Sequence, residues 1–453
     1  MLGLLATSSN FGGGWPTVRT AAGYVAPRLF DARERLFGAP QPEVIFWRDA
    51  AGWCPFCCMT WLLLEEMRVP YQVRTVPLRR YMRPGEQKDP DYLRQVGPGG
   101  VVPGVQFRNA DHEFLLAIQG VEQIVADLAQ RFPERYPRGD DSVHTRVLEG
   151  SSSIFARLRV ARRAYEACAG AQGADPMELG LGRVLEEIDE MLAESGGPFL
   201  CGERLSAADC VLLPLLERTE AVVPYFFGFG ALEALPFDRA ARMLAAARTQ
   251  SVAFEAVCSD SSTLGRTNLR YADDDYELRY FAAMEANPQQ PAARRLKGSP
   301  EAVAAIDGTE AGEYEAWAAD ATEGARREAA GRLAARPAAV AAFATRCATG
   351  SSSLQGLEAA AAAAAATTIE EALLAVASLL LTDEATRQGD GLRMQAHTAA
   401  DALRGTHGSE EAINTAAALE ALSLNIGVPR DMGVGPARAL RSHMRLLAAA
   451  LHT

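Results

Sequence analysis

The segment Cys54-Pro55-Phe56-Cys57 contains the residues of this sequence best suited to chemistry. Two thiols at this spacing lie one turn apart on a helix, where one attacks a disulfide and the other resolves the product. Zinc binding and inert packing are the competing interpretations. Because zinc needs a second ligand pair and the sequence has no other C-x-x-C or C-x-x-H motif, we favour a thiol-transfer site and expect no metal.

The elements around this pair are predicted to place Cys54 at the start of a helix. Residues 44–47 form an apolar run typical of a buried strand, and residues 71–76 alternate like a second strand. Residues 58–69 have helical spacing, and Pro55 suits a first helical turn because it lacks an N–H group. Unpaired backbone N–H groups and the helix dipole favour a thiolate there, which predicts Cys54 as the nucleophile. Cys57 would then resolve the mixed disulfide.

The next eighty residues complete the order β-α-β-α-β-β-α. Residues 104–107 and 112–118 are expected to form a hairpin, and a helix is expected from about 119 to 132. With this order the segment resembles a thioredoxin-fold domain. Its Val102-Pro103 resembles the Val-Pro with a cis peptide bond that faces the active cysteine in that fold. The resemblance implies that the residue before the proline pairs with the cysteinyl part of glutathione.

Two further segments are similar to the glutathione transferase superfamily. Residues 53–71, WCPFCCMTWLLLEEMRVPY, resemble members with a CPFC or CPYC motif, especially the iota class of photosynthetic organisms and its omega-like neighbours. Residues 199–218, FLCGERLSAADCVLLPLLER, resemble the signature of the helical domain, in which Ser206 and Asp209 form a capping box. The stretch at 425–451, which contains Val-Pro-Arg-Asp-Met, resembles the C-terminal segment of the iota class.

The resemblance implies a glutathione-dependent thiol transferase or reductase. A cysteine at this position forms a disulfide with glutathione, whereas tyrosine or serine supports conjugation to electrophiles. The implied partners are glutathione as co-substrate and a disulfide or electrophilic substrate. The implied site residues are catalytic Cys54 and Cys57 and glutathione-binding Phe56, Val102, Pro103 and Gln119.

One departure from the family pattern supports a different function. Members carry a Glu-Ser or Asp-Ser pair at the start of the helix before Phe132-Pro133, where it binds the γ-glutamyl carboxylate of glutathione. This sequence has Gly120-Val121 there or, with a shift of one residue, Gln119-Gly120. The alternative is therefore a catalytically degenerate member that serves as a structural or interaction subunit of a larger complex, including a plastid photosynthetic one. A carrier of a glutathione-like or tetrapyrrole-like ligand is a third hypothesis.

Composition narrows the setting. The chain has 453 residues, 57 acidic and 45 basic, with a net charge of -12, which argues against a nucleic-acid binder. No apolar run reaches about 18 residues, so no transmembrane segment is expected. The eight cysteines are too few and too unevenly spaced for a disulfide framework, which favours a reducing compartment, the chloroplast or the cytoplasm. A homodimer or a larger assembly stays open.

The predicted organisation has an α/β part followed by two all-α parts. Residues 1–42 are expected to be an N-terminal tail, either a transit-peptide remnant or a flexible segment, with a short helix and a linker at 31–42. A thioredoxin-like glutathione-binding domain at 43–137 and a glutathione transferase-type helical domain at 138–265 follow. Residues 266–453 are an alanine-rich helical extension.

Three features of the extension allow specific predictions. The run Ala359 to Ala366 is expected to be a helix or a loose linker. LKGSPEAVAAI at 296–306 matches LAARPAAVAAF at 333–343, which suggests two helix-turn-helix copies. Arg430 and Asp431 are expected to form an ion pair that fixes the turn before the last helix.

Overall fold

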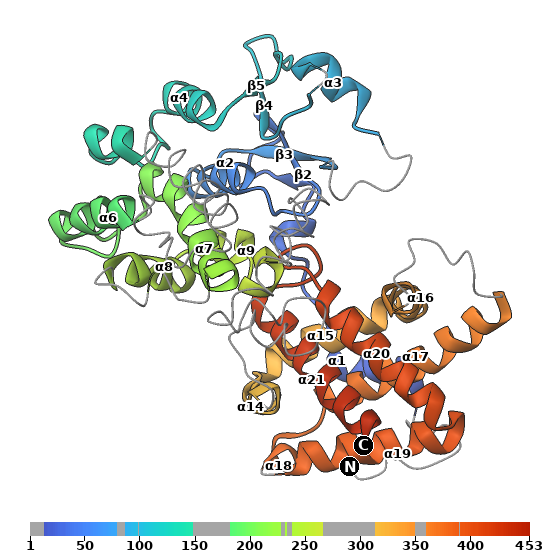
Figure 1. Ribbon diagram of the computed structural model, residues 1–453. Coiled ribbons are helices and arrows are strands. Elements are labelled where there is room, and N and C mark those ends of the chain that lie inside the picture. Colours follow the sequence, from blue (N-terminus) through green and yellow to red (C-terminus); the bar gives the residue numbers. More distant parts are fainter. Residues whose placement is uncertain are drawn as a thin grey trace, which may run out of the picture. The chain divides into compact units, whose positions relative to one another are not determined.

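The chain forms two compact units in the computed structural model, one of residues 27–306 and one of residues 1–26 with 307–453 (Figure 1). The structure describes residues 13–78, 87–97, 99–147, 182–227, 232, 238–265, 313–348, 359–388 and 390–453. Within these ranges no helix combines the length and the apolar character needed to cross a membrane.

A five-stranded mixed sheet forms the first part of the unit at 27–306. Its strands are β1 (Glu34–Arg35), β2 (Val44–Asp49), β3 (Tyr71–Val76), β4 (Gly104–Phe107) and β5 (Ile118–Gln119), in the order β1-β3-β2-β4-β5. β2 and β3 are parallel with Val44 opposite Tyr71, and the other neighbouring pairs are antiparallel. β2 is buried along its whole length, as its apolar run predicts.

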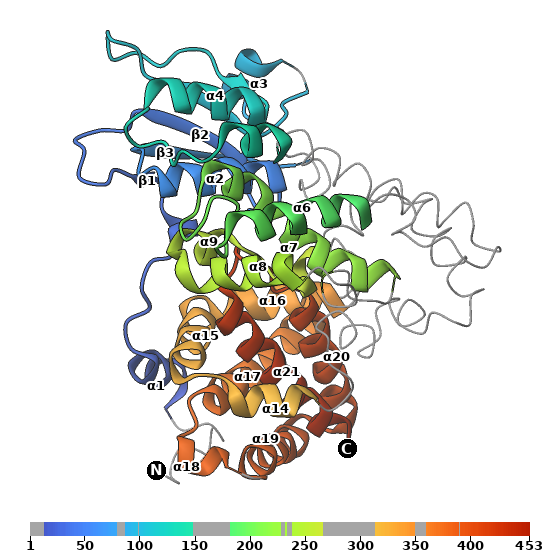
Figure 2. The same cartoon turned by 90° about the vertical axis from the view of Figure 1, so that its left-hand side faces the viewer.

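Helices of this sheet domain follow the predicted order. They are α2 (Pro55–Glu66), α3 (Pro90–Val96) and α4 (Val121–Arg131), preceded by the short 3-10 helix η1 (Leu29–Asp31). α2 packs against β2 and α4 (Figure 2). The predicted hairpin is shorter than expected. Only Ile118–Gln119 pairs with β4 as a strand. Nearer the turn, a single isolated bridge joins Arg108 and Phe114, and Leu116, between these two pairings, is exposed.

The helical domain of the same unit contains a described helical segment at residues 141–147 and the helices α6 (Gly182–Ser195), α7 (Ala207–Phe227), α8 (Asp238–Gln250) and α9 (Val252–Val257). α7 packs along α2. The predicted capping box is present: the Ser206 hydroxyl donates to Asp209 at 2.6 Å, and the Asp209 N–H donates back to that hydroxyl at 3.4 Å. Asp209 also accepts from the Leu200 N–H at 2.9 Å, which ties the preceding loop to the helix start.

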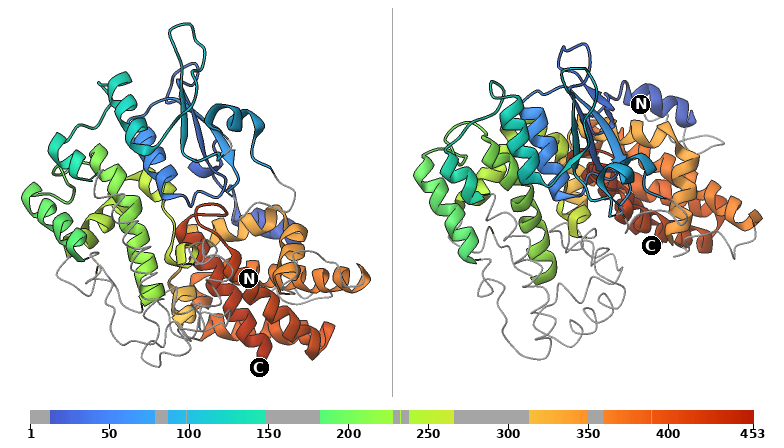
Figure 3. Two further views of the ribbon diagram at one scale, coloured as in Figure 1. Left: turned by 45° about the horizontal axis from the view of Figure 1, so that its top comes forward. Right: turned by 90° about the horizontal axis from the view of Figure 1, so that it is seen from above.

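The second unit is helical throughout its described part. Its elements are α1 (Gly14–Ala22), α14 (Glu313–Asp320), α15 (Glu323–Ala335), α16 (Pro337–Ala348), α17 (Ala359–Leu380), α18 (Glu384–Arg387), α19 (Gly391–His407), α20 (Ser409–Asn425) and α21 (Val434–His452). α21 packs against α14, α15, α17, α19 and α20, and so lies at the centre of the unit (Figure 3).

The predictions for this extension have definite outcomes. The polyalanine run is the first part of α17, a helix and not a loose linker. The second repeat copy forms the end of α15 and the start of α16, whereas the first copy lies outside the described residues. Arg430 and Asp431 form the expected ion pair at 2.6 Å, directly before α21.

The expected N-terminal tail at 1–42 is wrong for two of its segments. Residues 14–22 form α1, which packs on α15 and α17 with Val18 and Ala22 buried, and Trp15 Nε1 donates to Glu370 at 3.0 Å. The expected helix and linker at 31–42 instead contain β1, an edge strand of the sheet. Both segments are held by contacts with residues distant in the sequence: α1 packs on α15 and α17, and β1 pairs with β3.

Candidate active site

Cys54 lies where the β2–α2 loop becomes a helix. It is the N-cap residue of α2, with extended backbone angles, and Pro55 occupies the first helical position as predicted. The Cys54 carbonyl accepts the first helical hydrogen bond, from the Cys58 N–H at 3.0 Å. Cys54 is partly exposed, whereas Cys57 and Cys58 are buried. The one accessible sulfur of the cluster is therefore at the helix N-terminus, where backbone donors and the helix dipole favour an anion.

Cys57 contacts Cys54 from the next turn of α2. The two side chains are hydrogen-bonded, and both are free thiols. Burial raises the pKa of the Cys57 thiol well above its usual value, and the hydrogen bond to Cys54 raises it further. Cys57 is therefore protonated at neutral pH, so its S–H group can donate to the Cys54 sulfur.

The loop before Cys54 is fixed by contacts from three elements. The Asp49 carboxylate at the end of β2 accepts from the Trp53 N–H at 2.7 Å. Cys58 Sγ on α2 donates to the Gly52 carbonyl at 3.4 Å. Arg218 on α7 donates to the Trp53 carbonyl at 2.9 Å. The position of the Cys54 backbone is thus set by the sheet, the helix that follows it and the helical domain.

Arg218 and Glu217 form an ion pair at 2.6 Å with both side chains buried. Arg218 also donates to the Pro214 carbonyl at 2.8 Å and to Cys58 Sγ at 3.6 Å, and Glu217 accepts from the Ser259 N–H. Burial raises the pKa of Cys58 to about 12, although the positive charge of Arg218 opposes this. Cys58 is therefore a packing residue with a charged neighbour, Arg218.

Of the residues expected to bind glutathione, Val102 and Pro103 directly precede β4, Gln119 is in the neighbouring strand β5, and Phe56 is in α2. The Val102–Pro103 peptide bond is cis, as the resemblance implies, and both residues are buried. Gln119 donates to the Val101 carbonyl at 2.6 Å. Phe56 is half-buried in the first turn of α2. Pro103 and Gln119 are thus adjacent through β4 and β5, with Gly104 paired to Gln119.

Tyr92 contacts both the segment before the cis-proline and strand β2. Its hydroxyl donates to the Val101 carbonyl, and its ring stacks on Trp47 with the ring centroids 4.7 Å apart. Burial raises the pKa of Tyr92, so the phenol is protonated at neutral pH. A Cβ at Gly104 would lie 2.7 Å from the Tyr92 hydroxyl, which explains a glycine at that position.

A role for Tyr92 or Arg218 was not predicted from the sequence. Arg218 is the last residue of the quoted helical-domain signature, but its partner Trp53 is 165 residues away, and no local pattern links them. Tyr92 lies in a seven-residue helix without a motif. One feature of the sequence could have pointed to Arg218. Glu217 and Arg218 end an otherwise apolar helix segment, and charged side chains in such a segment need partners.

The start of α4 lacks a side-chain ligand for a carboxylate. Gly120 is its N-cap residue, with φ 85°, and makes no side-chain capping bond. A left-handed φ suits glycine and disfavours a serine at this residue. The departure from the family pattern seen in the sequence is therefore also a departure in backbone conformation.

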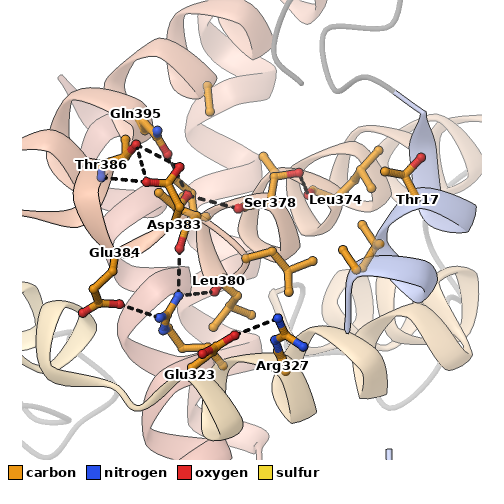
Figure 4. Close-up of a pocket in the computed structure, with 18 of the residues that line it drawn as sticks. Thr17, Glu323, Arg327, Leu374, Ser378, Leu380, Asp383, Glu384, Thr386 and Gln395 are labelled. Atoms are coloured by element: carbon orange, nitrogen blue, oxygen red, sulfur yellow. Dashed lines mark hydrogen bonds and ion pairs between the residues drawn. The ribbon is translucent and has the colours of Figure 1, made fainter. Parts of the chain in front are cut away.

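A cavity of about 740 Å³ lies within the second unit, between α1, α15, α17, α18 and α19 (Figure 4). Glu323 and Arg327 form an ion pair at its rim, 2.7 Å apart. Arg326 donates to the Leu380 and Thr382 carbonyls at the end of α17. The described residues that line this cavity include no cysteine or histidine. Across the described ranges, no three His, Cys, Asp or Glu side chains are placed to hold a metal ion.

Comparison with known proteins finds two family models that match segments of the first unit. Residues 53–131 match the family model of the glutathione S-transferase N-terminal domain. Residues 171–246 match that of the glutathione S-transferase C-terminal domain.

Individual relatives agree with these matches. The chain is 26% identical over 181 residues to probable glutathione S-transferase DHAR1, cytosolic, of Oryza sativa subsp. japonica, covering 40% of this chain and 74% of that one. It is 25% identical over 191 residues to glutathione S-transferase DHAR3, chloroplastic, of Arabidopsis thaliana, covering 41% and 62%. A crystal structure of dehydroascorbate reductase from Chlamydomonas reinhardtii aligns with 18% identity and a TM-score of 0.35, covering 53% of this chain and 97% of that one.

The thioredoxin-like order of the sheet domain, the capped α7 and the two family models agree on one assignment. Residues 53–131 and 171–246 thus resemble the N-terminal and C-terminal domains of the glutathione S-transferase superfamily.

Proposed function

We propose that residues 43–265 form a glutathione-dependent thiol transferase or reductase of the CPFC, iota-like class, with Cys54 as the nucleophile. The observation that carries this proposal is the placement of Cys54: it is the partly exposed N-cap residue of α2 and contacts a buried, protonated Cys57. The family uses glutathione as a substrate or co-substrate, and the relatives above are named glutathione S-transferases.

The reaction runs as two thiol–disulfide exchanges. The Cys54 thiolate attacks the glutathione sulfur of a mixed disulfide R–S–S–G, which forms a Cys54–glutathione disulfide and releases RS⁻, protonated to RSH. A second glutathione thiolate then attacks the glutathione sulfur of this adduct, releasing oxidised glutathione and the Cys54 thiolate. The net change is R–S–S–G plus GSH to RSH plus GSSG.

Cys57 offers a second route that the geometry makes slower. Attack by Cys57 on the Cys54 adduct would release glutathione and form a Cys54–Cys57 disulfide, but Cys57 must first lose its proton in a buried site. Resolution by a second glutathione is therefore the main route. Phe56, Val102, Pro103 and Gln119 are proposed to hold glutathione beside Cys54, with backbone N–H groups of α4 in place of the missing hydroxyl.

The test uses a glutathionylated peptide and mass spectrometry. The wild-type protein is expected to acquire one glutathione on Cys54, the Cys54→Ser variant none, and the Cys58→Ser control the wild-type amount. A Cys57→Ser variant is expected to keep turning over with excess glutathione. Absence of an adduct on wild-type Cys54, with no difference from Cys54→Ser, would overturn the proposal.

One observation favours a second candidate, a non-catalytic structural subunit. The α4 N-terminus has a glycine in place of the family's capping pair, and the chain carries an additional helical unit. Purification of the native protein within a stable larger complex, together with no adduct on Cys54, is the result this candidate predicts. A homodimer in a reducing compartment, the chloroplast or the cytoplasm, is the setting we propose for the enzyme; the two relatives above are named cytosolic and chloroplastic.

A further inference from the structure

Arg218 is the point at which the helical domain contacts the cysteine cluster. Its Nη2 donates to the carbonyl of Trp53, the residue covalently joined to Cys54, and to Cys58 Sγ on the same helix as Cys54. Its Nη1 is held by Glu217 and by the Pro214 carbonyl. Only 3% of the residue is exposed, so its orientation is fixed by these four contacts.

The positive charge of Arg218 is buried, and so is Cys58, whereas Cys54 is partly exposed. Burial lowers the pKa of Arg218, but its electrostatic interactions with Cys58, Glu217 and Cys54 outweigh burial, and the pKa is raised. The interaction is mutual, since a cation stabilised by nearby anions stabilises those anions equally. A buried charge pair is also screened much less by salt than a surface pair.

Other charged and titratable groups surround the same cysteines. On β2, Arg48 is stacked between the rings of Phe30 and Trp61, 4.4 Å from each centroid, and interacts electrostatically with Cys57 and Cys58. Asp49 and Glu217 add negative charge near Cys58, and Tyr92 is neutral. Arg218 differs from Arg48 because it also binds the carbonyl next to Cys54.

We propose that Arg218 is a positioning residue for Cys54: from the helical domain it holds the Trp53 carbonyl and supplies the buried positive charge that favours an anionic Cys54 sulfur. This inference rests on the proposed nucleophilic role of Cys54. It makes the helical domain part of the thiol chemistry itself, in addition to any role in binding the second substrate.

Glu217 provides a matched control of opposite sign. Replacing either partner breaks the same buried ion pair, so both changes destabilise the fold for the same reason. Their electrostatic effects differ, because Arg218→Met removes positive charge and Glu217→Gln removes negative charge. A purely structural role predicts that both variants lose reactivity together, whereas the proposal predicts that they diverge.

The measurement is the rate of alkylation of Cys54 by iodoacetamide against pH, with the modified cysteine located by fragment mass spectrometry. At pH 7 we expect Arg218→Met to react at least about tenfold more slowly than wild type, with the midpoint of its rate profile at higher pH. Glu217→Gln is expected to react as fast as wild type or faster. Arg218→Lys should lie between wild type and Arg218→Met, and Arg248→Met, which breaks the ion pair with Glu220 on the same domain, should match wild type.

The outcomes separate this inference from the proposed function. Equal loss in Arg218→Met and Glu217→Gln, or equal rates in Arg218→Met and Arg248→Met, would overturn the role of Arg218. Should Arg218→Met fail to fold, a tenfold fall in Glu217→Gln overturns it alone. A wild-type protein that is alkylated as expected but takes no glutathione contradicts the proposed function and leaves the role of Arg218 standing.

Discussion

Arg218 in the first unit and Arg387 in the second are both buried arginines, yet their neighbours differ. Arg218 faces a carboxylate and thiols, and its pKa is raised despite burial. Burial and the positive charge of Arg326 lower the pKa of Arg387 to about 10, and its donors go to the carbonyls of Ala318 and Leu379 and to His443. On our proposal, the arginine beside thiols supports their chemistry, whereas the arginine beside carbonyls and an imidazole holds helices together.

The sharpest test of this contrast is a set of cysteine replacements. Cys54→Ser is expected to lower glutathione-dependent turnover at least about a thousandfold, because serine cannot form the disulfide intermediate. Cys347→Ser, in the second unit, should leave turnover unchanged. Steady-state assays with a glutathionylated peptide measure both. Comparable losses of turnover in the two variants would show that the thiol chemistry is not confined to the first unit.

The next effect is a pH dependence confined to the second unit. Burial, followed by the charge of Arg387, lowers the pKa of His443 to about 3, whereas an unfolded histidine titrates near about 6.5. The folded form therefore holds a neutral imidazole, and the unfolded chain takes up the proton first as the pH falls. Stability from this group is complete above about pH 6.5 and falls progressively until pH 3, by on the order of 4–5 kcal/mol.

Chemical denaturation at several pH values, compared between wild type and His443→Gln, measures this effect. The glutamine variant keeps a donor and an acceptor but does not titrate, so its stability should depend less on pH between 6.5 and 3. Identical slopes for the two proteins would show that His443 is protonated in the folded state.

Arg387→Met should destabilise the second unit without touching the thiols. The change removes the Arg387 donor from the Ala318 carbonyl and one of two donors from the Leu379 carbonyl, which the Thr382 N–H also contacts at 3.3 Å, at a cost of about 1–3 kcal/mol. Thermal unfolding should show the loss, while alkylation of Cys54 at pH 7 should equal the wild-type rate. A slower alkylation rate would mean that the contrast with Arg218 is not one of chemistry.

Tyr92→Phe is the smallest change in the series. It removes one hydrogen bond to the Val101 carbonyl and should lower stability by about 1 kcal/mol, measured by urea denaturation. Because Gln119 also donates to this carbonyl, the backbone before Val102 is expected to stay in place. Loss of several kcal/mol would show that the tyrosine supports more than this one contact.

Local patterns in the sequence account for most of the first unit. Strand β3 begins and ends where the alternation predicted, Pro55 begins α2, and the Ser206–Asp209 box begins α7. The contacts that were missed connect residues with no shared local pattern. Arg218 meets Trp53 across 165 positions, and Trp15 meets Glu370 across 355. The alanine-rich composition predicted helices for the extension, but it did not indicate that α1 packs against them.

Helix α1 has a consequence for the order of folding. It leaves the ribosome before the rest of the chain described here, yet its partners α15 and α17 follow roughly 290 residues or more later. Closing a loop of that length costs about 5 kcal/mol of chain entropy, which the burial of Val18 and Ala22 and the hydrogen bonds of Trp15 and Arg19 must offset. The thioredoxin-like and helical domains can therefore complete their own cores first, while α1 waits as an unpaired amphipathic segment. Docking of α1 therefore requires that α15 and α17 have been synthesised and have folded, because these two helices form its binding surface.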